Sequence, residues 1–403
     1  MTAEDARSMG CPIVSTDFTL ERPVGWYHRE LDELRERSPF AWNDSTYGFW
    51  MINRYEHVRE AMATPELFSN ARTSALGDPN VKPRLLPQNL DGPEHMAYRH
   101  VLNPWFSPKA IARTEPMLRR RCAEMIIELE PVGRCDLAGG LAMELPTEVF
   151  LEHLGLPTED GPMMLPLVEA MSRGFFGGDP GELATTVDTI KAYFRRHLDE
   201  RRRAPLDPRE DFLSYLVTTD VGRAPLDHDD AVTLAFTIML AGLDTTRSAL
   251  GFMFHHLARH PDDRHRLIRN REEIPFAVEE FVRLYSLLLQ AGRLVVRDVD
   301  FHGCPLRAGD IVWLGLASAN RDPRQFDDAT EFVPDREANR HLGFGAGPHR
   351  CLGAHLARME LIAVLDEWLT RIPDFELDSD TEPRERGGQL MLRSVPLRWT
   401  PRG

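Results

Sequence analysis

A glycine-rich loop that ends in a cysteine constrains this chain more than any other feature. It reads Phe-Gly-Ala-Gly-Pro-His-Arg-Cys-Leu-Gly over residues 344–353. Its glycines let the backbone turn tightly and approach a flat ligand closely, which a Cβ atom would prevent. A helix is expected directly after Cys351, so backbone N–H groups and the helix dipole there favour the thiolate over the thiol. A thiolate in this setting is a strong, anionic metal ligand.

Three other interpretations of the cysteine loop stay open at this point. A phosphate-binding loop would use the alternating glycines, but no predicted strand leads into them and no Rossmann pattern surrounds them. A zinc site would use His349, Cys351 and His355, although a structural zinc ion usually recruits paired cysteines. An inert buried thiol is the usual fate of a cysteine.

Local patterns predict a helix-rich α+β chain, mainly α with small β-sheets near the N-terminal region and in the last third. The longest predicted helix covers about residues 229–259, with Pro261 as its stop signal. Its middle, residues 235–243, is apolar on nearly all sides and is therefore expected to be buried. Strand-like runs occur at 48–52, 292–296, 301–302 and 311–314. A helix after Cys351 has a core face made of Ala357, Leu361, Leu365, Trp368 and Ile372.

Charge and composition narrow the classes of function. The formal net charge of −15 argues against nucleic acid as a partner, because binding phosphates requires a cationic surface. No window approaches the roughly 20 apolar residues of a membrane span. Residues 1–15 lack the apolar core of a signal peptide, and they are expected to form a flexible N-terminus. The five cysteines are scattered and odd in number, which is typical of free thiols in a reducing cytoplasm.

The cysteine loop resembles the haem-binding signature of cytochromes P450 at Phe344, Gly345, Cys351 and Gly353. The resemblance implies the cytochrome P450 fold over residues 1–403, as a single large haem-binding domain with a long central helix. It also implies that Cys351 is the axial ligand of the iron in haem b (protoporphyrin IX iron).

Further features of the family occur in the expected order along the chain. Glu280 and Arg283 lie at i and i+3 on one predicted helix face, where they can pair, and Arg336 occupies the place of the family's third charged member. The resemblance implies that these residues lock the cysteine loop against the core. The runs at 91–95 and 319–323 look like the bacterial branch. Candidate partners for the haem propionates are His95, Arg99, Arg293 and His349.

The buried helix contains the run Ala-Gly-Leu-Asp-Thr-Thr at 241–246, which looks like the family's oxygen-activation motif. Small side chains at Ala241 and the next glycine leave room for dioxygen, and Ala241 and Thr245 should face the haem together. The resemblance implies that Thr245 stabilises the reduced oxygen while Asp244 and waters relay protons to it. The alternative is that the threonines only satisfy helix carbonyls.

The resemblance implies a monooxygenase that inserts one atom of O2 into a hydrophobic small molecule. Electrons would come from a separate ferredoxin and its reductase, which could dock on Arg350 and the arginines at 119–121. Substrate selectivity is expected in the loop after Ser69 and in residues 163–176, 240–241, 287–289, 295–296 and 391–392.

Two other functions stay open. A haem-thiolate peroxygenase would take its oxidant from peroxide and need no redox partner. A non-catalytic haem carrier or gas sensor would consume no reducing equivalents and would need no acid–alcohol pair.

Overall fold

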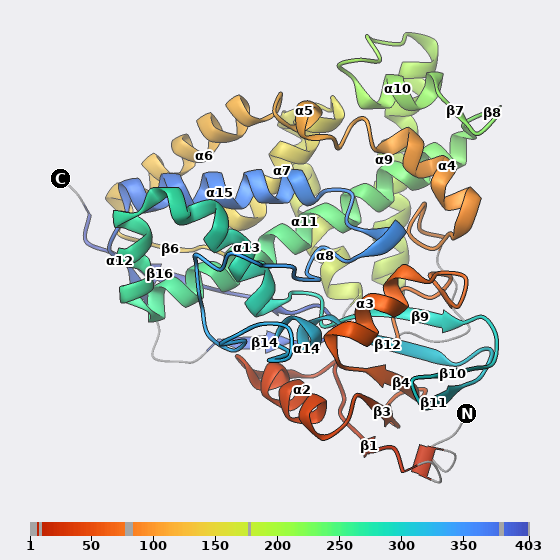
Figure 1. Cartoon of the computed structure of the whole chain (residues 1–403). Coiled ribbons are helices and arrows are strands. Elements are labelled where there is room, and N and C mark those ends of the chain that lie inside the picture. Colours follow the sequence, from red (N-terminus) through yellow and green to blue (C-terminus); the bar gives the residue numbers. More distant parts are fainter. Residues whose placement is uncertain (1–5, 8–9, 77–83, 176–178, 379–382, 402–403) are drawn as a thin grey trace.

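The computed structural model describes residues 6–7, 10–76, 84–175, 179–378 and 383–401. Figure 1 shows that helices make up most of this structure, while the strands of the largest sheet gather at the lower right. The long helix α11 (His228–Arg259) runs through the helical part. The prediction of a helix-rich α+β fold with a long central helix is therefore confirmed.

The other helices surround α11 or cover the largest sheet. The α-helices are α2 (Trp26–Arg37), α3 (Tyr55–Ala63), α4 (Gly92–Leu102), α5 (Pro108–Ile111), α6 (Glu115–Leu129), α7 (Leu141–Leu154), α8 (Gly161–Phe175), α9 (Pro180–Arg203), α10 (Phe212–Thr218), α12 (Pro261–Arg269), α13 (Ile274–Tyr285), α14 (Leu316–Asn320) and α15 (Ala354–Arg371). Short 3-10 helices are η1 (Glu130–Val132), η2 (Thr158–Asp160), η3 (Arg271–Glu273) and η4 (Gly347–His349).

The largest sheet joins strands from both ends of the chain. Its order is β1 (Ile13–Val14), β3 (Phe40–Asn43), β4 (Phe49–Ile52), β12 (Ile311–Gly315), β9 (Gln290–Val295) and β5 (Phe68–Ser69). The pairs β1–β3 and β12–β4 are parallel, and the other pairs are antiparallel. Strands were predicted at three of these places, but their union in one sheet was not, because periodicity does not encode long-range pairing.

Smaller sheets complete the β-structure. They are β10 (Val299–Phe301) with β11 (Cys304–Leu306); β13 (Glu376–Leu377), β16 (Pro396–Arg398) and β6 (Arg134–Asp136); β15 (Met391–Leu392), β14 (Arg384–Arg386) and β2 (Glu21–Pro23); and β7 (Asp220–Val221) with β8 (Ala224–Pro225).

Helix α11 has clear start and stop signals. The side chain of Asp227 accepts hydrogen bonds from the backbone N–H groups of Asp229 and Asp230, at 2.9 and 3.2 Å, and so caps the first turn. The helix ends at Arg259, as predicted. Pro261 then opens α12 at a first-turn position, where its missing N–H costs nothing.

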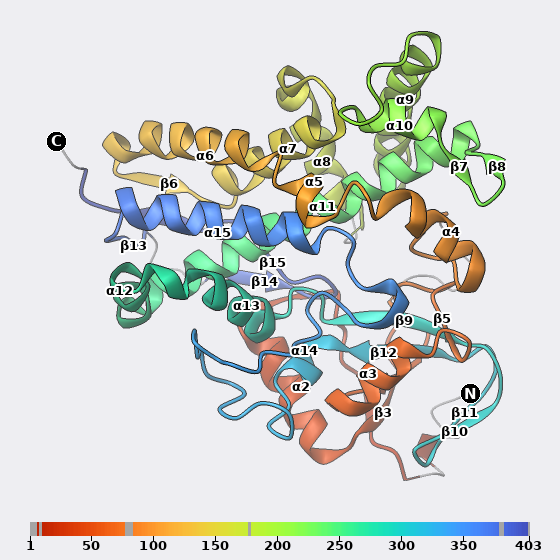
Figure 2. The same ribbon diagram turned by 45° about the horizontal axis from the view of Figure 1, so that its top comes forward.

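The apolar core is divided along α11. Residues 231–243 of this helix pack with α8, α9 and α10 in one buried cluster. Residues 249–257 pack with α6, α13 and α15 in a second cluster. The polar stretch 244–248 lies between them and belongs to neither. The helix therefore presents its polar residues at the boundary of two cores, where α15 crosses it (Figure 2).

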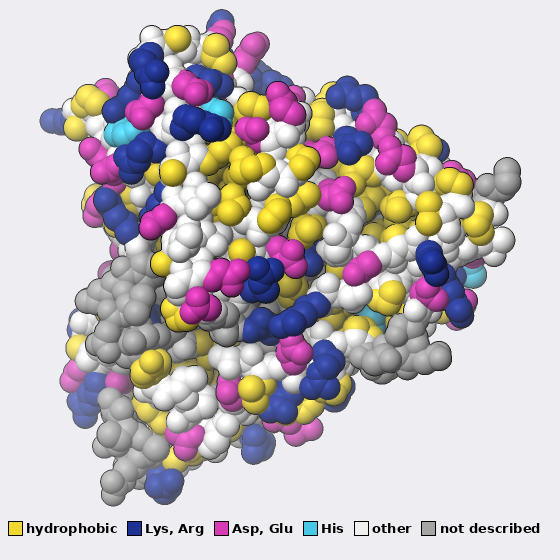
Figure 3. All heavy atoms as spheres, turned by 180° about the vertical axis from the view of Figure 1, so that it is seen from behind, with side chains coloured by type: hydrophobic (Ala, Val, Ile, Leu, Met, Phe, Trp, Pro, Cys, Tyr) yellow, Lys and Arg dark blue, Asp and Glu magenta, His cyan; other side chains and the backbone are white. Residues whose placement is uncertain are grey.

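The surface mixes charges of both signs. On the face seen in Figure 3, basic and acidic side chains lie beside one another, with hydrophobic side chains gathered over the middle. None of the described helices has the length and hydropathy of a membrane span. Of the N-terminal residues expected to be flexible, 1–5 and 8–9 lie outside the described residues, and Ile13–Val14 pairs with β3 as strand β1.

Candidate active site

The cysteine loop takes a tight, glycine-dependent conformation. Gly345 and Gly347 have φ angles of +70° and +68°, in the left-handed region that favours glycine. A Cβ atom on Gly347 would come within 2.5 Å of the carbonyl oxygen of Met62, so only glycine fits against α3 there. The Cys351 N–H donates to the carbonyl oxygen of Phe344 at 2.8 Å and closes the loop.

The sulfur of Cys351 lies in a recess and not on a convex surface. The side chain is accessible to solvent, although protein atoms surround it on most sides. The expected helix, α15, begins at Ala354, and the N–H of Gly353 forms a hydrogen bond with the sulfur. Because Cys351 is accessible, it is not the inert buried thiol that was one of the alternatives.

A backbone N–H group favours the thiolate at Cys351, as expected, but burial opposes it. Burial raises the pKa of this thiol, and the Gly353 N–H and the charges of Arg99, Arg358 and Arg350 offset that effect only in part. Desolvation penalises the charged form more than these groups stabilise it. A bound metal ion would add further stabilisation, since a coordinating thiol is deprotonated by the charge of the ion.

The charged residues expected to lock the loop form a fully buried cluster. Glu280 and Arg283, both 0% exposed, make a two-pronged ion pair with N···O distances of 2.8 and 2.7 Å. Arg336 adds a contact to Glu280 at 3.1 Å. Arg283 also donates to the backbone carbonyls of Ala329 and Glu331, in the segment that leads to the cysteine loop. The predicted pairing of these three charges is confirmed.

A second ion pair, not predicted from the sequence, joins helix α13, which carries Glu280, to helix α15, which follows Cys351. Glu279 on α13 accepts from Arg358 on α15 at 2.5 and 2.7 Å, and lies 2.9 Å from Nε2 of His341. The guanidinium of Arg358 covers the ring of Phe344 at 4.3 Å. These contacts keep the pKa of Glu279 low, at about 2, against the opposing effect of burial. The sequence did carry a signal, because adjacent glutamates on a helix point about 100° apart and need separate partners.

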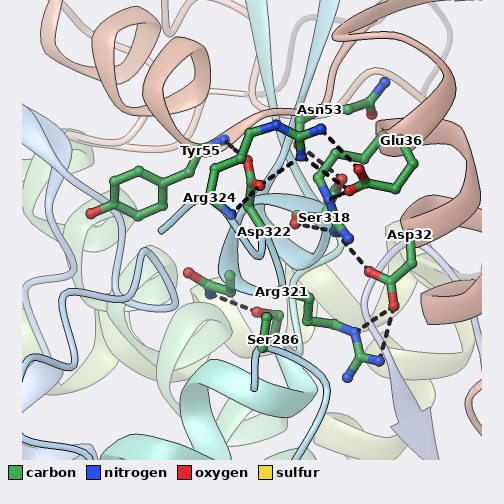
Figure 4. Close-up of polar contacts among 12 residues, drawn as sticks. Asp32, Glu36, Asn53, Tyr55, Ser286, Ser318, Arg321, Asp322 and Arg324 are labelled. Atoms are coloured by element: carbon green, nitrogen blue, oxygen red, sulfur yellow. Dashed lines mark hydrogen bonds and ion pairs between the residues drawn. The ribbon is translucent and has the colours of Figure 1, made fainter. Parts of the chain in front are cut away.

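The run at 319–323, which looked like the bacterial branch, forms a polar junction beneath the loop. Figure 4 shows Asp322 accepting from the backbone N–H of Tyr55, at 3.1 Å, at the start of α3. The amide oxygen of Asn320 accepts from the N–H of Leu342 at 2.6 Å. Other pairs in this junction are Arg321–Asp32 and Arg324–Glu36. The junction ties helices α2 and α3 to the segment that carries Cys351.

Two of the predicted propionate partners are cations that make no close ion pair with a carboxylate of the described residues, although Asp91 attracts Arg293 from farther away. Arg293 is 3% exposed, and its guanidinium donates to the carbonyl of Gly292 at 2.7 Å. Burial lowers the pKa of Arg293 to about 10. Arg99 donates to the carbonyl of Arg350 at 3.1 Å, and burial lowers its pKa as well. Buried cations are costly unless paired, so this site lacks negative charge that a ligand can supply.

The two predicted histidines lie against each other near the loop. The rings of His95 and His349 are 3.9 Å apart. Nε2 of His349 lies 3.2 Å from Asp91, whose carboxylate also accepts from Ser69 at 2.5 Å. Nδ1 of His95 is buried without a hydrogen-bond partner. Burial and the neighbouring His349 lower the pKa of His95 to about 4. The role of Asp91 as an acceptor was missed, since its partners are distant in the sequence.

The middle of α11 is open on one side. Ala241 and Gly242 are exposed in the centre of a helix whose neighbours are buried, and a Cβ atom on Gly242 would meet nothing within 4 Å. The hydroxyl of Thr245 donates to the carbonyl of Ala241 at 2.9 Å, which is the i to i−4 bond that the sequence suggested. Ala241 and Thr245 therefore share a face that borders open space.

A buried acid beside the threonines was also missed. Glu360 on α15 is 4% exposed and accepts from the hydroxyl of Thr246 at 3.2 Å. Burial raises the pKa of Glu360 to about 8, so it is protonated at neutral pH. Asp244, one residue before Thr245, is 5% exposed. The sequence contained the signal for Glu360, because position 360 falls on the apolar stripe of the helix after Cys351.

These residues fit haem better than they fit zinc. Among the described residues, three metal-ligating groups converge only at His256, His260 and Asp263. The zinc interpretation of the cysteine loop is therefore wrong. An accessible sulfur, open space at Gly242 and Gly353, and buried donors without carboxylate partners fit a flat group that carries a metal and two carboxylates.

Comparison with known proteins gives a consistent result. The family model for cytochrome P450 matches residues 159–401. The chain is 32% identical to the probable cytochrome P450 127A1 of Sinorhizobium fredii over 87% of this chain and 84% of that protein. It is also 32% identical to the steroid C26-monooxygenase of Mycolicibacterium smegmatis over 88% of each. The crystal structure of CYP101J2 superposes with a TM-score of 0.87 at 30% identity, covering 96% of this chain and 97% of that one.

The family match extends over more than half of the chain, and the structural match covers nearly all of it. Both agree with the cysteine loop, the buried charge cluster and the open helix described above. The chain belongs to the cytochrome P450 family and is a haem-binding monooxygenase.

Proposed function

We propose that Cys351 would hold the haem iron of a monooxygenase that inserts one atom of O2 into a hydrophobic small molecule. The observation that carries this proposal is the sulfur itself. It is accessible in a recess, receives the N–H of Gly353, and belongs to a loop fixed by one buried and one half-buried ion pair. An N–H donated to the sulfur stabilises its negative charge, as outer hydrogen bonds do for other metal ligands.

Four side chains are proposed to hold the two haem carboxylates. Arg293 and Arg99 supply guanidinium groups, which bind carboxylates through charge-assisted hydrogen bonds. His95 supplies the buried Nδ1 that has no partner in the protein. His349 is already oriented by Asp91, so its ring is held in place before a ligand arrives. Each of these groups gains a partner that the protein does not provide.

Haem with a thiolate ligand supplies the electron-rich iron that favours O–O cleavage. The protein's own task is to deliver protons on the open side of α11. The single hydroxyl proton of Thr245 is committed to the Ala241 carbonyl, so its oxygen can accept a hydrogen bond from water. Rotation of the hydroxyl away from Ala241 would let it donate towards the open space. We propose that Asp244 resupplies protons to water in this open space.

Electrons are proposed to come from a ferredoxin and its reductase. Arg350 is exposed next to Cys351 and forms no ion pair with a described residue. The arginines at 119–121 are poorer candidates, because Arg119 pairs with Glu115 at 2.8 Å and Arg121 with Glu148 at 2.6 Å. Arg350→Glu should raise the KM for ferredoxin, whereas Arg121→Glu should not. Equal effects of both variants would reject this assignment.

The substrate is proposed to be hydrophobic and small to medium in size. Of the residues expected to select it, Met163, Leu288 and Val296 are 43%, 39% and 50% exposed. In contrast, Val295 and Leu392 are at most 1% exposed and pack in the core, so they do not face open space. Residues 77–83, in the loop after Ser69, and residue 176 lie outside the described residues. A relative acts on a steroid by its name, which is compatible with this class.

We also propose a cytoplasmic location. All five cysteines are free thiols, as expected for a protein kept in a reducing compartment. Measured reactivity of all five thiols in freshly isolated native protein under denaturing conditions would support this; disulfides would argue against it.

The ligand assignment is tested with Cys351→Ser. The variant should lose the ferrous–carbonyl absorption typical of thiolate ligation and all O2-dependent product formation, while far-ultraviolet circular dichroism stays that of a folded protein. Cys135→Ser is the matched control, because Cys135 is a half-buried free thiol on β6. Retention of the thiolate band in Cys351→Ser would reject the proposal. Turnover of wild type with peroxide alone, as fast as with reduced ferredoxin, would favour a peroxygenase instead.

A further inference from the structure

A second group of potential metal ligands lies at the far end of α11, away from the cysteine loop. His256 is in the last turn of this helix, His260 is its C-cap, and Asp263 is in the first turn of α12. Their ligand atoms all lie within 4.8 Å of one another. His256 and His260 are at i and i+4, the spacing at which histidines on one helix face share a zinc ion. At about 1.5 Å per residue, His256 lies roughly 16 Å along the helix from Thr245.

His256 is already oriented as a metal ligand would be. Its side chain is buried, and Nδ1 lies 2.7 Å from the hydroxyl of Tyr285. Nε2 faces the carboxylate of Asp263 at 2.9 Å. Metal-bound histidines usually have their second nitrogen held by an outer partner in this way, which fixes the ring and its tautomer. The Tyr285 contact therefore leaves Nε2 to point at the other ligands.

His260 completes the group from the solvent side. Its ring is exposed and stacks on His256, with centroids 4.3 Å apart and planes 23° apart. Because nitrogen lone pairs lie in the ring plane, the exposed His260 ring has to turn about its side-chain bonds before both imidazoles can bind one ion. Arg259, next to His260 in the chain, carries a positive charge that opposes a bound cation. The groups that converge are two imidazoles and one carboxylate.

We propose that His256, His260 and Asp263 bind a divalent transition-metal ion, with zinc the best match. Two imidazole nitrogens and a carboxylate oxygen suit Zn²⁺, whereas Mg²⁺ and Ca²⁺ prefer sites made of oxygen alone. Water takes the fourth position of a tetrahedral ion. Zinc replaces the hydrogen bond between His256 and Asp263 with two metal–ligand bonds.

The ion would join two helices at this end of the molecule. Its ligands come from the end of α11 and from α12, which follow one another at the left in Figure 2. Metal binding is therefore expected to stabilise the junction of these two helices. It is expected to leave the haem site itself unchanged, because no ligand is shared.

Zinc binding to the haem-loaded protein, purified without a polyhistidine tag and stripped with a chelator, tests this inference. Isothermal titration with Zn²⁺ and elemental analysis after dialysis should show one zinc per chain, and the ion should raise the unfolding temperature by a few degrees. Mg²⁺ at the same concentration should not.

His260→Ala should abolish this stoichiometric zinc, because the exposed His260 is a ligand but adds little to folding. His265→Ala is the matched control: the His265 side chain is 45% exposed, lies on α12 and contacts a carboxylate, that of Asp374, at 3.2 Å. This variant should bind zinc as the wild type does. Wild type without stoichiometric zinc, or His260→Ala with unchanged affinity, would overturn the inference and leave His256–Asp263 as a simple hydrogen bond. The haem absorption spectrum should stay constant throughout, which separates this test from that of the ligand at Cys351.

Discussion

The two sides of the candidate haem site are built in opposite ways. On the cysteine side, two ion pairs hold the segments around the loop: the buried pair of Glu280 with Arg283 and the half-buried pair of Glu279 with Arg358. On the opposite side, α11 exposes Ala241 and a glycine in mid-helix, and Thr245 bonds only to its own helix. The cysteine side is held by many long-range contacts, whereas the α11 side borders open space.

This difference follows from what each side has to do. A ligand atom must be held within a few tenths of an ångström of its place, and locked rotamers with outer hydrogen bonds achieve that. A side that admits O2, water and substrate must instead keep room, and small residues provide it. The two regions touch through Glu360 of α15 and Thr246 of α11. The contrast predicts that substitutions on the cysteine side alter stability, whereas those on the open side alter chemistry.

The largest effect is expected from breaking the buried charge cluster. Arg283→Met leaves Glu280 buried with only part of its compensation, which costs about 3–5 kcal/mol when one partner of a buried pair is removed. The apparent free energy of unfolding in urea should fall by this amount, and haem content should drop with it. Arg398→Ala is the control: its pair with Glu376 is exposed, so the loss should stay below about 1 kcal/mol. Similar losses of unfolding free energy in both variants would contradict the prediction that buried charge stabilises the cysteine side.

The second-largest effect concerns the contact of Glu360 with Thr246, which joins the two sides, and it depends on pH. Burial raises the pKa of Glu360 to about 8, so the folded protein keeps a proton that the unfolded chain, with a carboxyl pKa near 4.3, has lost. The stability contributed by Glu360 is thus fully present at low pH and is lost as pH rises from about 4.5 to 8. Glu360→Gln removes this slope, so wild type should lose up to a few kcal/mol relative to the variant over that range.

Thermal unfolding of both proteins at several pH values measures this difference. Glu385→Gln serves as a comparison, because burial raises the pKa of Glu385 to about 7 at a different place, beside the start of α2. The loss of stability with rising pH that Glu385 causes should end about one pH unit lower than the loss that Glu360 causes. A constant difference between wild type and Glu360→Gln would show that Glu360 is ionised in the folded protein.

A third, smaller effect should have opposite signs in the haem-free and haem-loaded protein. Arg293→Met removes a buried cation that has no carboxylate partner among the described residues, so the haem-free protein should gain about 1 kcal/mol. The same change removes a charge-assisted hydrogen bond to haem, worth about 1.5–3 kcal/mol, and should weaken haem binding by roughly tenfold to a hundredfold. Arg264→Met is the control, since Arg264 is buried but donates to the carbonyls of Leu257 and Phe375. It should destabilise both forms and spare haem affinity. A destabilised haem-free Arg293→Met would reject the proposed role.

Local sequence patterns predicted much of the cysteine side, although long-range contacts hold its geometry in place. The glycines of the loop, the helix after it and the pairing of Glu280, Arg283 and Arg336 all follow from short spacings or from the resemblance to the family. The pattern of α11 was also visible, because its apolar middle and Pro261 just after its end are local signals.

Long-range contacts could not be predicted in the same way. Asp91 meets His349 across 258 positions, and Glu279 meets Arg358 across 79, so no periodicity connects them. The direction of the pKa shift of Cys351 could not be predicted for a different reason. The sequence displayed the helix dipole and the nearby arginines but not the burial, and burial decides the direction of the pKa shift.

The smallest change in stability, and the clearest change in chemistry, is expected at Thr245. Thr245→Ala removes a hydroxyl that bonds only within its own helix, so the unfolding free energy should change by less than about 1 kcal/mol. If Thr245 delivers protons on the open side, product formed per electron should fall several-fold, with haem binding intact. Thr237→Ala is the matched control, since Thr237 makes the same bond to Thr233 at 2.8 Å but lies in a closed apolar cluster. Its product yield should match that of wild type. Because the two threonines differ in the space they face and not in their bonds, an equal yield in both variants would mean that the open side of α11 has no part in proton delivery.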